Sequence, residues 1–157
     1  MLYHNIPRLL KNKYDTMAIY FSNENVKFDL SDPERVRRWI SHVVRVHGKR
    51  VGEVNYLFCD DAYLLEVNRT YLDHDTYTDI ITFDYVEGDV ISGDILISID
   101  RVGENAKTFG CTFEHELHRV IIHGVLHLLG NKDKTDAEAT AMRKKENQAL
   151  KNLENFQ

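Results

Sequence analysis

The stretch that decides the fold, residues 121–133, reads IIHGVLHLLGNKD. Its apolar residues lie on nearly every side when the segment is drawn as a helix, so we expect a buried helix. His123 and His127 are four residues apart and share one helical face, close enough to bind the same cation. Gly130 readily ends a helix, and a chain that doubles back there brings Asp133 beside both histidines. We predict a metal site formed by His123, His127 and Asp133.

Two imidazole nitrogens and one carboxylate oxygen form a ligand set that zinc accepts, with a fourth position open for water as in catalytic zinc sites. We therefore expect one Zn²⁺ per chain, although the oxygen ligand also suits manganese, iron or nickel. No side chain is assigned a catalytic role, because water on the ion can supply the nucleophile. The structural alternative is a pair of histidines packed inside a helix without metal, since 8 histidines in 157 residues produce such spacings by chance.

A zinc peptidase shares the H-x-x-x-H spacing and is one alternative function. Its HExxH motif needs a glutamate as general base directly after the first histidine, and that position is Gly124 here. Peptide hydrolysis would therefore lack its proton acceptor. Asp73, His74 and Asp75 are a second group with metal-binding side chains, although turn chemistry explains this polar run more simply.

Several motifs recur in one order along the chain. The segment HGVLHLLG, followed by Asp133, resembles the pattern H-G-x-L-H-L-x-G-x-x-H. Residues 78–83, TDIITF, resemble a TDVLSF strand, and residues 93–98, GDILIS, resemble a GDIxIS strand. Asn68 falls on the asparagine of an LNxxYR motif. Together these matches, spread over roughly residues 18–150, resemble the YbeY family, the single-strand endoribonucleases of ribosomal RNA maturation.

This resemblance implies a metal-dependent endoribonuclease that acts on single-stranded RNA in 16S rRNA maturation and ribosome quality control. Its partners would be ribosomal RNA or the small ribosomal subunit, with no DNA and no membrane. Attack by water and attack by the neighbouring 2′-hydroxyl both remain open.

Two positions depart from the family pattern. The third histidine falls on Asp133, and the arginine of LNxxYR falls on Leu72, with Arg69 one turn earlier as a possible substitute. These departures favour an alternative, a non-catalytic ribosome-associated assembly factor in which the metal is structural or absent.

The formal net charge of −5 argues against a protein that coats nucleic acid without specificity, so contacts with RNA phosphates must be local. The best basic stripe follows one face of the helix expected at residues 34–47 and continues just beyond its end; it consists of Arg35, Arg38, His42, Arg45 and Lys49. We take Arg35, Arg38, Arg45 and, outside this helix, Arg69 as candidate RNA-binding residues. A solvated helix face is the alternative.

Length and composition predict one cytoplasmic domain. The chain contains no apolar run of about 18 residues, and its first residues lack the apolar core of a secretory signal. Its two cysteines, Cys59 and Cys111, form no CxxC motif and are expected to be reduced. We expect residues 1–16 to be a weakly structured extension, with Met17 a possible natural start, and residues 17–157 to form the single endoribonuclease-like domain.

The order of the expected elements indicates an α+β fold with a mixed four-stranded sheet packed against helices and a zincin-like metal helix. Helices are expected at residues 34–47, from Asp60 or Asp61 to Tyr71, at 101–107, from Thr112 or Glu114 onward, and at 136–155. Strands or hairpins are expected at residues 18–21, 26–30, 51–59, 80–85 and 94–99.

Overall fold

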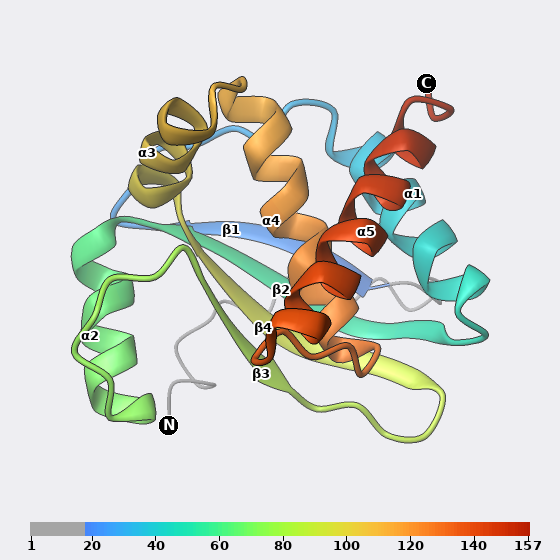
Figure 1. Ribbon diagram of the computed structural model, residues 1–157, viewed down its shortest axis with the longest axis horizontal. Helices are drawn as coiled ribbons and strands as arrows, with labels where there is room; N and C mark the ends of the chain where they lie inside the picture. The colour runs from blue at the N-terminus through green and yellow to red at the C-terminus, as the bar shows by residue number, and fades with distance from the viewer. Residues whose placement is uncertain (1–17) are drawn as a thin grey trace.

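The structure is a computed structural model that describes residues 18–157. The expected extension at residues 1–16 and the start at Met17 lie outside this range. The elements follow one another along the chain as β1 (Ala18–Glu24), α1 (Pro33–Val46), β2 (Arg50–Cys59), α2 (Asp61–Leu72), β3 (Ile80–Asp84), β4 (Val90–Ser98), α3 (Ile99–Phe109), α4 (Phe113–Leu128) and α5 (Asp136–Leu153) (Figure 1). Among the described helices, none is both long and apolar enough to cross a membrane.

The four strands form one mixed sheet in the order β1-β2-β4-β3. Strands β1, β2 and β4 are parallel, and β3 pairs with β4 in the antiparallel direction at one edge. The unit β1-α1-β2 is therefore a parallel crossover, and β3 and β4 form a hairpin. The predicted α+β fold with a mixed four-stranded sheet is confirmed.

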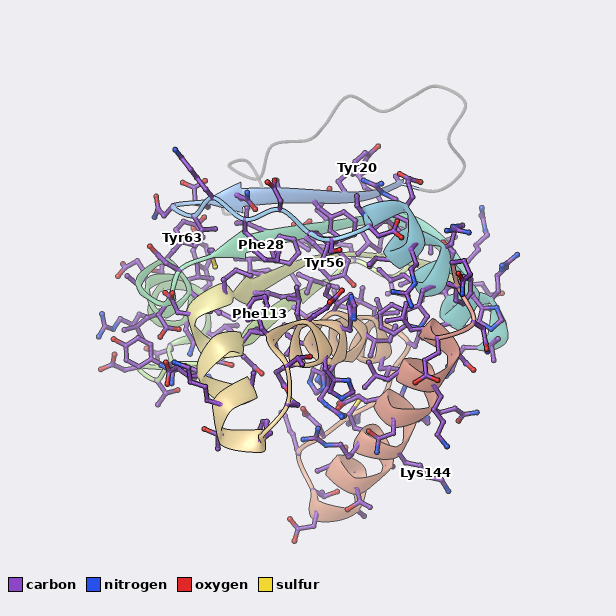
Figure 2. All side chains as sticks on the ribbon, turned by 90° about the horizontal axis from the view of Figure 1, so that it is seen from above. Tyr20, Phe28, Tyr56, Tyr63, Phe113 and Lys144 are labelled. Atoms are coloured by element: carbon purple, nitrogen blue, oxygen red, sulfur yellow. The ribbon has the colours of Figure 1, made fainter. Side chains whose placement is uncertain are left out.

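Strand β2 is buried on both faces, as its sequence predicts. Tyr56 and Phe58 point to the core shared with α1, α4 and α5, whereas Leu57 and Cys59 point to the opposite face, which α2 covers. The Tyr56 hydroxyl donates a hydrogen bond of 2.9 Å to the carbonyl of Ile121 and so ties the sheet to α4. Tyr56 is labelled among the side chains of Figure 2. Burial on both faces explains why this strand is apolar at nearly every position.

The expected strand or hairpin at residues 26–30 is wrong. That segment is irregular, yet Val26, Phe28 and Leu30 pack partly buried against the core. The Phe28 ring lies 5.0 Å from the ring of Phe58 in an edge-to-face arrangement. The alternating pattern therefore arose from side-chain packing without any strand pairing.

The expected bounds of the fourth strand, residues 94–99, are also corrected. Strand β4 already begins at Val90, which pairs with Arg50 of β2, a partner that lies far away in the sequence. At its other end, the Ser98 side chain accepts a hydrogen bond from the backbone nitrogen of Arg101 and caps α3. Ile99 therefore begins a helix and does not end the strand.

Candidate metal centre

Helix α4 carries His123 and His127 in its last turns. Its N-cap is Thr112, one of the two residues expected there, and it ends at Leu128. Gly130 then adopts a φ of 94°, a left-handed conformation that lets the chain turn back. The side chain and backbone nitrogens of Asn131 both donate to the carbonyl of Leu126 and hold this turn. The turn carries Asp133 back beside the histidines.

The three predicted ligands converge. The Nε2 atoms of His123 and His127 are 2.9 Å apart, and Asp133 Oδ2 is 3.3 Å from each of them. Ligand atoms bound to one tetrahedral zinc ion at about 2.0–2.2 Å are separated by roughly 3.3–3.5 Å. The spacing and the chemistry of the donors therefore fit a shared divalent ion. Within the described part of the chain, this is the one group of three such side chains that could hold a metal ion.

Glu146 of α5 orients His123, and the sequence analysis did not find it. Its Oε2 lies 2.7 Å from His123 Nδ1, so the ring donates its Nδ1–H to the carboxylate and keeps the Nε2 lone pair toward the other ligands. Glu146 is only 4% exposed, and Arg119 Nη1 lies 3.1 Å from its Oε1. This pairing of carboxylate and histidine is typical of metal-bound histidines.

Opposing effects set the pKa values of this pair. Burial disfavours the charged form of both groups, but the hydrogen bond and charge of Glu146 raise the pKa of His123 above its usual value. The carboxyl group of Glu146 keeps a lowered pKa despite its burial, because His123 and Arg119 stabilise its negative charge. Glu146 is therefore an ionised acceptor at neutral pH.

A cleft of about 780 Å³ opens beside the three ligands. It follows the edge strand β3, with the end of α2 and the loop after it on one side and the histidines of α4 on the other. Asp79, directly before β3, lines this cleft, and burial raises the pKa of its carboxyl group. Asp79 belongs to the TDIITF segment, whose resemblance to a strand motif gave it no role.

Gly124, between the two histidines, faces the sheet. A Cβ atom at this position would lie 3.0 Å from two side-chain atoms of Ile95 and 3.1 Å from the side chain of Ile80. There is consequently no room for the general-base glutamate of a zinc peptidase at this position. The absence of a side chain also lets α4 approach the sheet closely.

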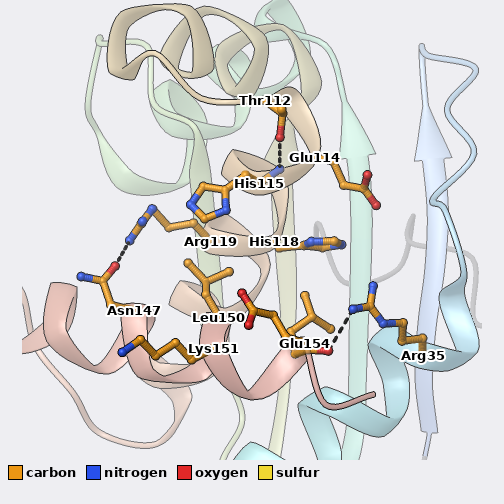
Figure 3. Close-up of a pocket in the computed structure, with 11 residues that line it drawn as sticks. Arg35, Thr112, Glu114, His115, His118, Arg119, Asn147, Leu150, Lys151 and Glu154 are labelled. Carbon is orange, nitrogen blue, oxygen red and sulfur yellow. Dashed lines mark hydrogen bonds between the residues drawn. The ribbon is translucent and has the colours of Figure 1, made fainter. Parts of the chain in front are cut away.

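The candidate RNA-binding arginines lie away from this cleft. Arg35 borders a second hollow of about 410 Å³, between the first turns of α4 and the end of α5 (Figure 3). There its guanidinium donates to the carbonyls of Leu153 and Phe156, and Arg38 donates to the carbonyl of Gln157. These two arginines hold the C-terminal end of the chain against α1.

Arg45 and Arg69 are both exposed, and neither lines the cleft. Arg69 forms an ion pair with Asp75. Leu72, which stands where the resemblance expects an arginine, does line the cleft, as does Asn68. Asn68 donates a hydrogen bond of 2.8 Å to the carbonyl of Thr76 and so holds the loop between α2 and β3.

A family model described as Endoribonuclease YbeY matches residues 20–154. The chain belongs to the YbeY endoribonuclease family. The Endoribonuclease YbeY of Bacteroides thetaiotaomicron is 51% identical over 134 residues, which cover 85% of this chain and 98% of that protein. The Endoribonuclease YbeY of Flavobacterium psychrophilum is 54% identical over 129 residues, which cover 82% and 92%.

The fold also matches a solved structure. A protein from Thermotoga maritima, determined in solution, superposes with a TM-score of 0.62 at 28% identity and covers 86% of this chain and 88% of that one. The sequence relationships and the fold thus agree on the YbeY endoribonuclease family, and the resemblance noted in the sequence is confirmed.

One signal in the sequence could have revealed Glu146. The buried residues of α5 are Met142, Glu146, Ala149 and Leu153, which recur at helical spacing on its inner face. An acidic residue in an apolar stripe is costly unless it is paired, so its position alone indicates a buried partner.

Proposed function

We propose that the protein is a metal-dependent endoribonuclease specific for single-stranded RNA, which acts in the cytoplasm in ribosomal RNA processing, including 16S rRNA maturation and ribosome quality control. The observation that carries this proposal is the convergence of His123, His127 and Asp133 at the wall of a cleft, in a chain of the YbeY endoribonuclease family. Zinc is the proposed ion, because two imidazoles and a carboxylate suit it.

A bound divalent ion would lower the pKa of a water molecule and polarise a non-bridging phosphate oxygen. The chain contributes the geometry. Glu146 keeps His123 in the tautomer whose Nε2 lone pair faces the other ligands. The turn at Gly130 holds Asp133 at equal distances from both histidines. The cleft beside them offers a path for an extended strand along β3.

Cleavage of short single-stranded and double-stranded ribosomal RNA fragments tests this function. We expect the zinc-loaded protein to cut the single-stranded fragments and the metal-stripped protein to leave both intact. His127→Ala should remain folded, lose its metal by elemental mass spectrometry and fall to the metal-free rate. His115→Ala, an exposed histidine on the same helix, serves as the matched control and should cut normally. Equal cleavage by wild type and His127→Ala would overturn the metal-dependent mechanism.

Leu72 in the cleft supports a second candidate, a non-catalytic RNA-binding assembly factor, because the family arginine is missing there. Its metal would be structural, so His127→Ala should then unfold the protein as well as remove the ion. Circular dichroism of that variant separates the two candidates.

A further inference from the structure

The cleft beside the metal ligands offers an RNA strand little positive charge. Among the described residues that line it, Lys134 is the one with a permanently cationic side chain. Asp79, Asp84 and Asp133 line the same cleft, and only Asp133 belongs to the ligand group. Contacts with phosphates depend on cationic side chains along the path of the strand. This cleft therefore needs another source of affinity.

Two arginines beside the loop that borders the cleft already form ion pairs with carboxylates. Arg69 is paired with Asp75. Arg101 of α3 places its Nη2 2.8 Å from Asp61 Oδ2 of α2. Asp61 in turn accepts a hydrogen bond of 2.6 Å from the hydroxyl of Ser98, which is fully buried. Arg101 is thus held in place, and the carboxylate of Asp61 largely balances its positive charge.

The fixed guanidinium of Arg101 lies over the ring of Tyr77, 5.1 Å from the ring centroid. Tyr77 lines the cleft and is 57% exposed. The loop that carries it is held by the hydrogen bond from Asn68 to Thr76. A positioned cation therefore backs one face of the ring, and the exposed side chain lines the cleft.

We propose that Tyr77 is the stacking platform for an unpaired nucleobase of the RNA strand that occupies this cleft; the proposal rests on the proposed function. Every base has a π-face, so stacking on an exposed aromatic ring binds RNA without regard to sequence and without cationic side chains. A base inside a duplex is already stacked on its neighbours and cannot offer its face. Tyr77 thus supplies both affinity and the preference for single strands.

Equilibrium binding of a short, fluorescently labelled 2′-O-methyl oligouridylate to the zinc-loaded protein tests the platform, with the intactness of the probe checked on a gel. Tyr77→Ala should weaken binding by about tenfold, and Tyr77→Phe should restore it. The matched control is Phe109→Ala, which removes an equally exposed ring (57%) outside the cleft and should bind as the wild type does.

A second probe of the same length without bases isolates the stacking. The wild type should bind this abasic strand about as weakly as Tyr77→Ala binds the complete one, and Tyr77→Ala should not change abasic binding further. If Tyr77→Ala weakened the binding of both probes equally, or of neither, the proposed stacking on Tyr77 would be overturned. Because binding is measured without cleavage, a protein that binds through Tyr77 but never cuts RNA would refute the nuclease and keep the platform.

Discussion

Helix α4 carries two pairs of histidines whose surroundings differ. His115 and His118 lie near its beginning, beside the hollow that Arg35 borders (Figure 3). His115 is exposed, and the buried ring of His118 packs edge-to-face on Trp39, with centroids 5.9 Å apart. At the other end of the helix, His123 and His127 bring their Nε2 atoms to 2.9 Å from each other.

Histidines at helical spacing thus form a metal site only when carboxylates from other segments complete it. Asp133 from the turn after α4 and Glu146 from α5 approach the second pair. Burial against Trp39 instead lowers the pKa of His118, so this ring is stable as a neutral core residue. Variants of the residues around each pair test this contrast.

Removing Asp133, the carboxylate that faces both Nε2 atoms, should leave His123 and His127 without a metal site, as His115 and His118 are. Asp133→Ala is expected to lose most of its metal affinity, because two imidazoles alone leave the ion underligated, whereas Asp133→His should retain or raise it. Titration against a chromophoric chelator measures both. Unchanged affinity in the alanine variant would refute the three-ligand site.

Loss of the Glu146 carboxylate should lower metal affinity less than loss of Asp133, because Glu146 acts through His123. Glu146→Gln keeps the size of the side chain but removes the charge that stabilises the Nδ1–H bond, and we expect a 10–100-fold loss of metal affinity. Glu154→Gln, at the end of the same helix beside the other hollow, is the control and should bind metal normally. Similar affinities for the two variants would show that Glu146 is only structural.

The position of α4 on the sheet should depend on Gly124. Gly124→Ala would force a methyl group against Ile95 and Ile80, and we expect a loss of about 1–3 kcal/mol in the free energy of unfolding. Gly103→Ala, in α3, meets only Phe113 at 3.9 Å and should instead stabilise by about 0.5–1 kcal/mol. Urea denaturation measures both. Stabilisation of both variants would show that the helix can move away from the sheet at no cost.

The smallest effect concerns the pH dependence that His118 contributes. Burial lowers its pKa, with Glu114 opposing and Arg35 reinforcing the shift. The unfolded chain then binds a proton more readily than the folded one, so stability is lost as the pH falls below the ordinary value of 6.5. His118→Gln should show a shallower decline in the free energy of unfolding between neutral and mildly acidic pH. Parallel curves for wild type and variant would contradict this cause.

Much of the fold could be predicted from local sequence. Asp32 caps α1 and Thr135 caps α5 through side-chain oxygens that accept backbone hydrogen bonds, and residues of this type favour helix starts. The start of β4 could not be predicted, because Val90 is a strand residue only through its pairing with Arg50. The alternating pattern at residues 26–30 predicted a strand wrongly, since none of the strands within residues 18–157 pairs with this segment.

The candidate site also contains residues that local sequence predicts and residues that it does not. The three metal ligands lie within 11 residues of one another, counted from His123 to Asp133, so helical spacing and one glycine turn sufficed to predict them. Arg35 and Arg38 formed an equally regular stripe, yet the tertiary structure uses both to bind carbonyls at the C-terminal end of the chain. Regular spacing on a helix shows which residues share a face, but it does not show what that face contacts.

The sequence by itself determined that His123 and His127 share one face of a helix and that the chain turns back toward them at Gly130, because backbone geometry and steric limits act over a few residues. Only the tertiary structure decided that Glu146 orients His123, that Asp79 and Tyr77 border the same cleft, and that His118 is a core residue. Those contacts join segments far apart in the chain, and the packing of whole helices on the sheet selects them.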